Sequence, residues 1–259
     1  MPKNASFSLL RRGSRFLRRT AFRLLPTVEP GQIKSLDELM KALPRIKLPA
    51  RTDMIGGWLT ENEQRALYAL GAMAGSPSLE IGPWLGRSTV CLAKGIRSSG
   101  QTKEFFTCEL NPTLANFKHL PDGRVAFHYP LDSPVTMGIC SRKSFEEEIR
   151  PVVSHEMGVV GQLRANLRNF KVADLVEIRT GDFRAAALDR PYQLIFADTM
   201  HEPSEIRRNA PDLLRYLADG AMLACHDTTE ENRKVLLEYF SVAQYVQIDS
   251  LFIGIVRKR

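Results

Sequence analysis

The chain has 259 residues, which is enough for one large α/β domain with appendages or for two small domains. Hydrophobic residues make up 44% of it and charged residues 25%, as is ordinary for a globular protein, and no run of ~18 apolar residues predicts a membrane span. The four cysteines form no C-x-x-C pair, so the sequence indicates neither a zinc site nor a disulfide framework, and a reducing, cytoplasmic compartment is the simplest setting.

The net charge of +7 is concentrated at the N-terminus, in a basic amphipathic arm over residues 1–30. This arm carries seven basic side chains and one acid. Its arginines alternate with leucines and phenylalanines, a pattern that predicts a helix ending before Pro26. Three roles stay open for it: packing on the body or on the partner subunit of a homo-oligomer, peripheral contact of residues 1–25 with an anionic membrane, and nucleic-acid binding or targeting.

Residues 31–76 predict a helical cap that precedes the main domain. A short helix is expected over residues 35–43, with Ser35 as its N-cap. A stronger helix begins at Thr60, where Thr60 and Glu63 have the spacing of a capping box, and it ends at the Gly75-Ser76-Pro77 sequence.

From residue 77 to residue 259, predicted strands and helices alternate. Strands are expected over residues 78–81, 105–110, 176–180, 193–198, 221–225, 245–248 and 251–256, and helices over residues 88–96, 157–170, 206–217 and 231–240. Repeated β-α-β units predict a parallel sheet with helices on both faces. Only two residues separate the last two strands, so these must pair as a hairpin. The predicted fold class is therefore α/β: a Rossmann-like, doubly wound, mostly parallel seven-stranded sheet with an antiparallel C-terminal edge hairpin.

Residues 111–155 interrupt this alternation. The segment is long for a connection in an α/β domain, and long connections are usually functional or disordered. We interpret it as a substrate-covering insertion with a short helix over residues 144–149. The acidic run over residues 146–148 is interpreted as a solvated helix face.

The turn after the first strand carries two glycines, Gly82 and Gly86, in the segment Glu80-Ile81-Gly82-Pro83-Trp84-Leu85-Gly86-Arg87-Ser88. Glycine allows a sharp turn and a close approach of the backbone to a ligand. The spacing is G-x-x-x-G and differs from the dinucleotide fingerprint G-x-G-x-x-G, which argues against a loop that grips a pyrophosphate. An acid at the strand end, Glu80, suits a cationic ligand group better than a phosphate.

This loop resembles that of the class I S-adenosylmethionine-dependent methyltransferases, in which an E-x-G-x-x-x-G segment holds the methionine part of the cofactor. The resemblance implies that an acid at the end of the second strand, Glu109, binds the ribose hydroxyls. It also implies that Asp182 lies near the adenine and that Phe183 offers a ring to stack on it. The expected cofactor-binding residues are Glu80, Gly82, Trp84, Gly86, Ser88, Glu109, Asp182, Phe183 and Asp198.

Two pairs of polar residues follow the fourth and fifth strands: Asp198 with His201, and His226 with Asp227. In a doubly wound sheet these strands are neighbours, so two carboxylates and two imidazoles are expected to converge, where they can act as a general base or bind a divalent metal. The pattern D-x-x-H followed by H-D resembles a subgroup of these methyltransferases that acts on small natural products and sugars. A hydroxyl acceptor must lose its proton, and a neutral histidine is suited to take it, so Asp198, His201 and His226 are the expected catalytic residues. His201 is slightly favoured over His226 as the base, because a metal would orient the pair at 226 and 227. The resemblance also implies a Mg²⁺ site at Asp198, His226 and Asp227.

The expected function is therefore S-adenosylmethionine-dependent O-methylation of a small-molecule hydroxyl. Two alternatives stay open: an NAD-binding oxidoreductase, in which Glu109 would bind the ribose, and a non-catalytic cofactor-binding protein on the same fold. A nucleic-acid methyltransferase is disfavoured, because the body lacks a basic surplus and lacks the Asn/Asp-Pro-Pro-Tyr/Phe type of motif.

Overall fold

The computed structural model describes residues 26–133, 135–187 and 189–258. Residues 1–25, which hold most of the basic arm, lie outside the described residues, so the predicted helix and its partners stay predictions. In the part of the chain that is described, no helix has the length and apolar character needed to cross a membrane.

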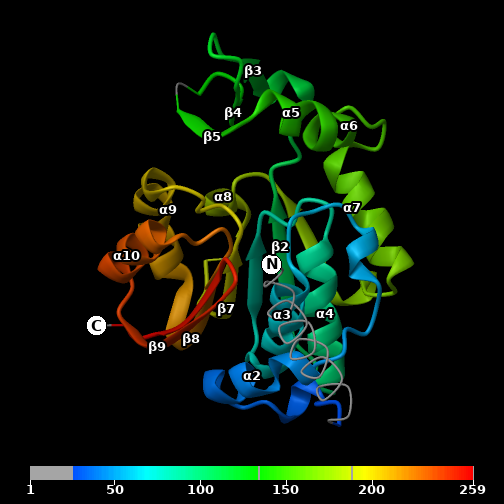
Figure 1. Ribbon diagram of the computed structural model, residues 1–259, viewed down its shortest axis with the longest axis vertical. Coiled ribbons are helices and arrows are strands. Elements are labelled where there is room, and N and C mark those ends of the chain that lie inside the picture. Colours follow the sequence, from blue (N-terminus) through cyan, green and yellow to red (C-terminus); the bar gives the residue numbers. More distant parts are fainter. Residues whose placement is uncertain (1–25, 134, 188, 259) are drawn as a thin grey trace, which may run out of the picture.

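A seven-stranded sheet runs through the middle of the molecule (Figure 1). Its order is β6-β2-β1-β7-β8-β10-β9. All neighbours from β6 to β8 are parallel, whereas β10 is antiparallel to both β8 and β9. The predicted fold class is confirmed. The strands are β1 Ser78–Ile81, β2 Phe105–Glu109, β6 Glu177–Thr180, β7 Tyr192–Ala197, β8 Leu217–Cys225, β9 Val242–Ile248 and β10 Leu251–Val256.

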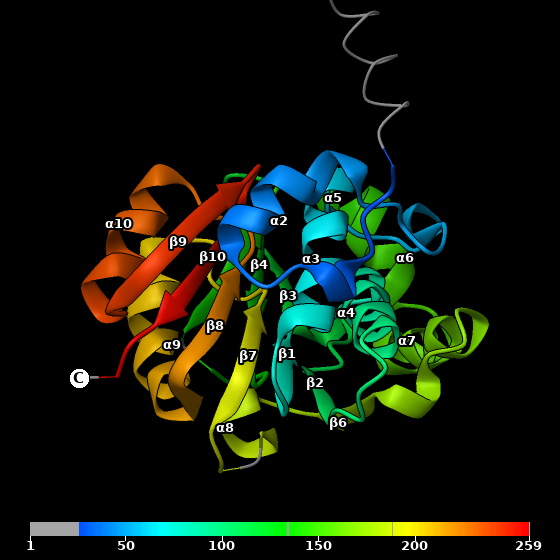
Figure 2. The ribbon, with the colours of Figure 1, turned by 90° about the horizontal axis from the view of Figure 1, so that it is seen from below.

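Helices cover both faces of this sheet (Figure 2). One face carries α2 Leu36–Ala42, α3 Glu61–Met73, α4 Arg87–Ser98 and α7 Gly158–Asn169, and the other carries α8 Phe183–Ala186, α9 Pro203–Tyr216 and α10 Glu230–Tyr239. Alternate residues of a strand point to opposite faces. In β7, accordingly, Leu194 and Phe196 join the first core while Ile195 and Ala197 join the second. The sequence alternation thus specifies a three-layer molecule.

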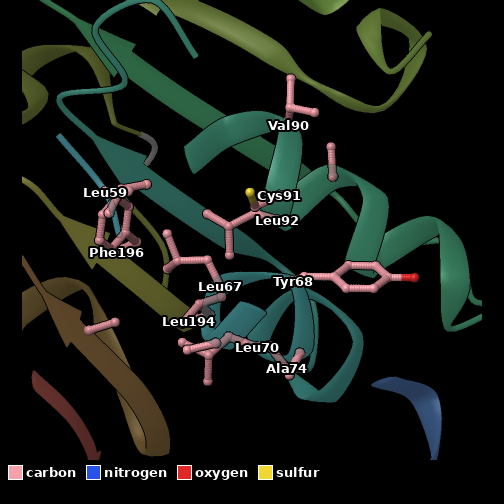
Figure 3. Close-up of a cluster of buried hydrophobic side chains, with 14 of the residues drawn as sticks. Leu59, Leu67, Tyr68, Leu70, Ala74, Val90, Cys91, Leu92, Leu194 and Phe196 are labelled. Atoms are coloured by element: carbon pink, nitrogen blue, oxygen red, sulfur yellow. The ribbon is translucent and has the colours of Figure 1, made fainter. Parts of the chain in front are cut away.

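The cap helix α3 shares the first core with the main domain (Figure 3). It crosses α4 at a pair of glycines, Gly71 and Gly95. A Cβ on Gly71 would lie 2.1 Å from the carbonyl oxygen of Leu92, and one on Gly95 would lie 2.1 Å from that of Tyr68. The two backbones approach so closely that neither position has room for a side chain. This contact holds the first turn of α3 near the carboxyl edge of the sheet.

The insertion forms a second sheet that the sequence patterns do not predict. Three antiparallel strands, in the order β3-β4-β5, stand above the carboxyl ends of the main sheet (Figure 1). The Pro121-Asp122-Gly123 sequence between β3 and β4 is a recognisable turn signal for such a hairpin. The expected helix over residues 144–149 is part of a longer helical stretch. The elements are β3 Phe117–His119, β4 Val125–His128, β5 Thr136–Cys140, α5 Arg142–Ser144, a π-helix Phe145–Ile149 and α6 Arg150–Val153.

Short 3₁₀ turns connect the remaining segments. They are Pro30–Gln32, Leu43–Arg45, Thr52–Met54, Leu114–Asn116 and Ala173–Leu175.

The substitution Gly95→Ala tests the helix contact. Alanine is a better helix former than glycine by about 1 kcal/mol, yet we expect the variant to be less stable by about 1–3 kcal/mol, because the added methyl group overpacks the crossing. Urea unfolding measures the difference. Gly31→Ala is the control, since its Cβ would meet no atom closer than 3.6 Å. A Gly95→Ala variant at least as stable as the wild type would contradict the close approach.

Candidate functional site

A cavity of about 470 Å³ lies at the carboxyl edge of the main sheet. Strand order reverses there, because the chain runs from β1 to β2 and β6 and then returns to β7 on the other side of β1. Ligands bind at such switch points in open α/β sheets, and the volume is typical of a small-molecule pocket. Four parts of the chain form its walls: the strand ends with the loops that follow them, helices α8 and α9, the insertion, and Trp58 of the cap segment.

The glycine loop contributes two of its predicted residues, Gly82 and Trp84, to the cavity wall. Gly82 has a φ of +82°, and a Cβ there would lie 2.7 Å from the carbonyl oxygen of Asp198. Glycine is therefore required where the loop passes β7. Glu80, Gly86 and Ser88 do not line the cavity; Gly86 is the N-cap of α4, with a φ of +93°.

Glu80 is a fully buried carboxyl group at the end of β1. Its Oε2 accepts hydrogen bonds from Thr89 Oγ1 at 2.6 Å and Thr107 Oγ1 at 2.9 Å. Burial raises the pKa of Glu80 to about 7 despite these hydrogen bonds. Its Oε1 has no hydrogen-bond partner among the described residues and so keeps its full capacity to accept.

Glu109 lines the cavity at the end of β2. The backbone N–H of Trp84 donates to its Oε2 and that of Asn111 to its Oε1, both at 3.1 Å. Burial outweighs these hydrogen bonds and raises the pKa of Glu109 to about 7. Each oxygen keeps a lone pair, so the carboxylate can accept from two adjacent hydroxyl groups.

Asp182 and Phe183 also line the cavity, but Arg184 engages both. Asp182 accepts from the backbone N–H of Arg184 at 2.9 Å, and its carboxylate lies 3.0 Å from the Arg184 guanidinium. That guanidinium also lies over the Phe183 ring, 4.7 Å from its centre. The predicted adenine contacts of these two residues must share space with Arg184.

Asp198, His201, His226 and Asp227 lie together at the ends of β7 and β8. Asp198 Oδ1 is 3.1 Å from His226 Nδ1 and 3.6 Å from His201 Nε2. His201 Nε2 is 3.9 Å from Asp227 Oδ2. Neighbouring strand ends therefore bring these four side chains into one acid–imidazole cluster on the cavity wall.

The buried side chain of His226 lies between two carboxylates. On the side opposite Asp198, its Nε2 is 3.5 Å from Glu63 Oε2, which comes from the first turn of α3. Glu63 also accepts from the backbone N–H of Thr60 at 2.8 Å, and from the N–H and hydroxyl of Ser250 at 2.8 and 2.7 Å. It thereby joins the cap helix to the C-terminal hairpin and to the cluster.

This arrangement determines the charges of His226 and Glu63. Burial alone would lower the pKa of His226, but hydrogen bonds with Asp198 and Glu63 raise it to about 10. Burial would raise the pKa of Glu63, and its hydrogen bonds, above all that with His226, lower it to about 2. His226 is thus an imidazolium whose two nitrogens both face carboxylates. In this geometry both nitrogens are already engaged by carboxylates.

His201 is the more accessible histidine. Its Nδ1 lies 3.0 Å from Glu205 Oε2, which also accepts from its backbone N–H at 2.7 Å. Its Nε2 faces Asp198 and Asp227 across the cavity wall. Burial would lower the pKa of His201, but Asp198 and Glu205 raise it well above its usual value. His201 stands two residues before α9, and Glu205 in the first turn of that helix reaches back to it.

Asp198, His201 and Asp227 can each offer one ligand atom, and these atoms lie within 4.8 Å of one another. Two carboxylates suit magnesium, and an imidazole beside them is more typical of Mn²⁺, Zn²⁺ or similar ions. The histidine that the geometry brings to this set is His201, whereas the sequence pattern favours His226.

Glu63 and Glu205 are functional candidates that the sequence patterns do not reveal. Glu63 is visible only as a capping-box residue, and nothing local links it to His226. Glu205 has a weak signal, its i,i+4 spacing from His201.

Residues 79–228 match the family model described as a methyltransferase domain. The match covers more than half of the chain, which therefore belongs to the class I S-adenosylmethionine-dependent methyltransferases, as its sequence motifs predict. The alternative of an NAD-binding oxidoreductase is set aside. No curated protein matches the sequence.

Two solved structures are similar to this chain at a TM-score of 0.50. One is cofactor-bound Rv0187 from MTB, at 16% identity, with 94% of this chain and 97% of that chain covered. The other is the O-methyltransferase NovP, at 14% identity, with 77% and 82% covered. At these identities the similarity establishes the fold alone.

Glu63→Gln tests the link between cap and cluster. Glutamine leaves His226 without one of its two counter-charges, and we expect a loss of about 3 kcal/mol in the free energy of unfolding. Glu61→Gln, on the exposed side of the same helix turn, should cost less than about 1 kcal/mol. Denaturant titration compares the two. Equal stabilities of both variants and wild type would rule out the proposed link.

Glu80→Gln tests the buried carboxyl group through pH. The folded pKa of about 7 lies above the ordinary value of 4.5, so between these pH values the folded state holds a proton that the unfolded state has released. Stability should therefore fall as pH rises from about 4.5 to 7. Over this pH range, the free energy of unfolding should fall by on the order of 1–3 kcal/mol less in the variant than in the wild type. Glu238→Gln, an exposed control, should keep the wild-type profile.

Proposed function

We propose that this methyltransferase transfers a methyl group to the hydroxyl oxygen of a small molecule held between the sheet edge and the insertion. One observation carries the proposal. Glu109, on the cofactor side, and the acid–imidazole cluster of Asp198, His201, His226 and Asp227 line the same cavity. A hydroxyl acceptor must lose its proton as the new bond forms, and the cluster supplies groups that can orient the hydroxyl and receive the proton.

The residues present fit S-adenosylmethionine. Glu109 has free acceptor capacity for the two ribose hydroxyls, and Gly82 lets the backbone approach the methionine part. The carboxylate of Asp198, on the cavity wall, complements a positively charged ligand. When bound, the cofactor supplies an activated methyl group on a sulfonium, and transfer needs close alignment of donor and acceptor. Gly86 and Ser88 would support the loop from behind.

His201 is the proposed general base, and His226 is proposed to position Asp198. His201 Nε2 faces the cavity, while Glu205 holds its Nδ1. Because its pKa is raised, His201 must first release its own proton before it can act. His226 cannot release a proton and act as a base without breaking its contact with Asp198 or Glu63. Asp198 would hold the acceptor hydroxyl in line.

A divalent cation is proposed at Asp198 and Asp227, beside the Nε2 atom of His201, which stays free to act as the base. The two carboxylates fit Mg²⁺, the expected ion. When bound there, a cation would orient the acceptor hydroxyl and make it more acidic.

The insertion is proposed to cover the acceptor. Its side of the cavity is largely apolar, and Trp58 Nε1–H donates to Glu148 Oε2 at 3.2 Å, which connects the cap segment with the insertion. The acceptor is therefore expected to have an apolar body. The apolar residues that the insertion contributes to the cavity wall are Phe117, Val125, Phe127, Met137, Ile139 and Ile149.

Two variants should separate cofactor binding from chemistry. Glu109→Ala is expected to weaken S-adenosylmethionine binding by at least about tenfold, because it removes the acceptor for two hydroxyl groups. His201→Gln is expected to retain binding but lower turnover by about 10²-fold. Calorimetry measures binding, and S-adenosylhomocysteine release over a panel of small hydroxylated acceptors measures turnover.

His155→Gln, in the exposed part of the insertion, is the matched control and should behave as the wild type. Absence of S-adenosylmethionine binding to the wild type at high micromolar concentration would refute the proposal. Full turnover by His201→Gln would refute the role of His201.

A further inference from the structure

Arg208 stands on the cavity wall without an acidic partner. It belongs to α9, and its side chain lines the cavity. Its Nη1 makes one long contact, 3.5 Å from the carbonyl oxygen of Thr136 on β5. Its Nε is buried and has no hydrogen-bond partner, and no ion pair joins it to a carboxylate of the described residues. The Nε atoms of Arg65, Arg179 and Arg190 also lack partners, but each of those guanidinium groups pairs with a carboxylate through Nη2. A buried donor left unpaired is costly.

Arg184, on the same wall, is a guanidinium whose donors are occupied by partners within the chain. It pairs with Asp182 at 3.0 Å and with Asp212 at 2.7 Å, and it donates to Asn209 Oδ1 at 2.6 Å. The contrast indicates that the protein leaves the donors of Arg208 free for a group that is not part of the chain.

The position of Arg208 relates it to the acid–imidazole cluster. Glu205, which holds His201, lies three residues earlier and so faces the same side of α9. A Cβ on Gly138 of β5 would lie 3.8 Å from Glu205 Oε1, and Thr136, two residues away on the same strand, contacts Arg208. Helix and strand therefore run side by side. Along the helix axis, the backbone of Arg208 lies about 4.5 Å beyond that of Glu205.

The remaining wall around this point is apolar and aromatic. Phe117 and Phe127 pack with ring centres 5.1 Å apart, and Ile139 lines the cavity beside them. Two acids of this wall are already engaged, Glu205 by His201 and Asp182 by Arg184. An occupant that satisfies this region has a flat apolar body and one group that accepts the donors of Arg208.

We propose that Arg208 binds a carboxylate on the acceptor, and that the acceptor class is therefore aromatic hydroxy acids. A guanidinium offers two parallel N–H donors to a carboxylate. With its carboxylate on Arg208, such a molecule places its ring against the phenylalanines and its hydroxyl toward Asp198 and His201. This inference rests on the proposed O-methylation and deepens it by naming the substrate class.

Binding of benzoate and of its neutral isostere benzamide tests the inference without requiring turnover. Both are titrated into the full-length protein in the presence of S-adenosylhomocysteine, with calorimetry or ligand-observed NMR as the readout. We expect benzoate to bind at least about tenfold more tightly than benzamide. Arg208→Gln should abolish this preference, and Arg208→Lys should keep part of it, because lysine retains the charge but not the paired donors.

Arg207→Gln is the matched control: its side chain is exposed one residue earlier on α9, and it should keep the full preference. Equal binding of benzoate and benzamide to the wild type would overturn the inference. So would a preference that survives in Arg208→Gln. Failure of the proposed function is a separate result, namely that no hydroxylated acceptor, acidic or neutral, accepts a methyl group although S-adenosylmethionine binds.

Discussion

The rest of the site depends on one interaction, the imidazolium of His226 held between Glu63 and Asp198. Removing three ionisable groups from water is expensive unless their charges and hydrogen bonds complement one another. Here each His226 nitrogen faces a carboxylate, and the remaining Glu63 lone pairs accept from Thr60 and Ser250. The arrangement therefore stabilises the cluster and also fixes the cap helix, the C-terminal hairpin and the end of β7 relative to one another.

Backbone packing is what allows Glu63 to reach His226. The Gly71 and Gly95 crossing brings α3 onto α4 at a distance that no larger residue permits, and the capping box orients the first turn of α3 toward the hairpin. A wider crossing would leave His226 with a single counter-charge. The cap is thus part of the machinery that sets the electrostatics of the cavity, although its only described contribution to the cavity wall is Trp58.

What the sequence predicts, and what it does not, follows from the range of the interactions. The strand–helix alternation, the hairpin and the glycine loop are local, so their patterns predict the sheet and its edge. Glu109 and Asp198 are also predictable, because parallel strand ends must meet at one edge. The pairing of Glu63 with His226 spans most of the chain, and a capping-box glutamate looks the same whether or not a histidine lies beyond it. Arg208 is likewise one arginine among several on an amphipathic helix, and only the cavity distinguishes it from Arg207.

His226 and His201 differ in how they offset the negative charge of the carboxylates around them. His226 is enclosed, and its raised pKa favours the positively charged form, which offsets Glu63 and Asp198. His201 is half exposed, and its proton offsets Asp198 and Asp227 only as long as no other cation does. A divalent ion and a protonated His201 compete for the same carboxylates, so binding of an ion would release the proton that otherwise prevents His201 from acting as a base. Because the charge of His226 is enclosed, it keeps the cluster assembled whether His201 is protonated or not. His201 can therefore change its protonation state without disrupting the site.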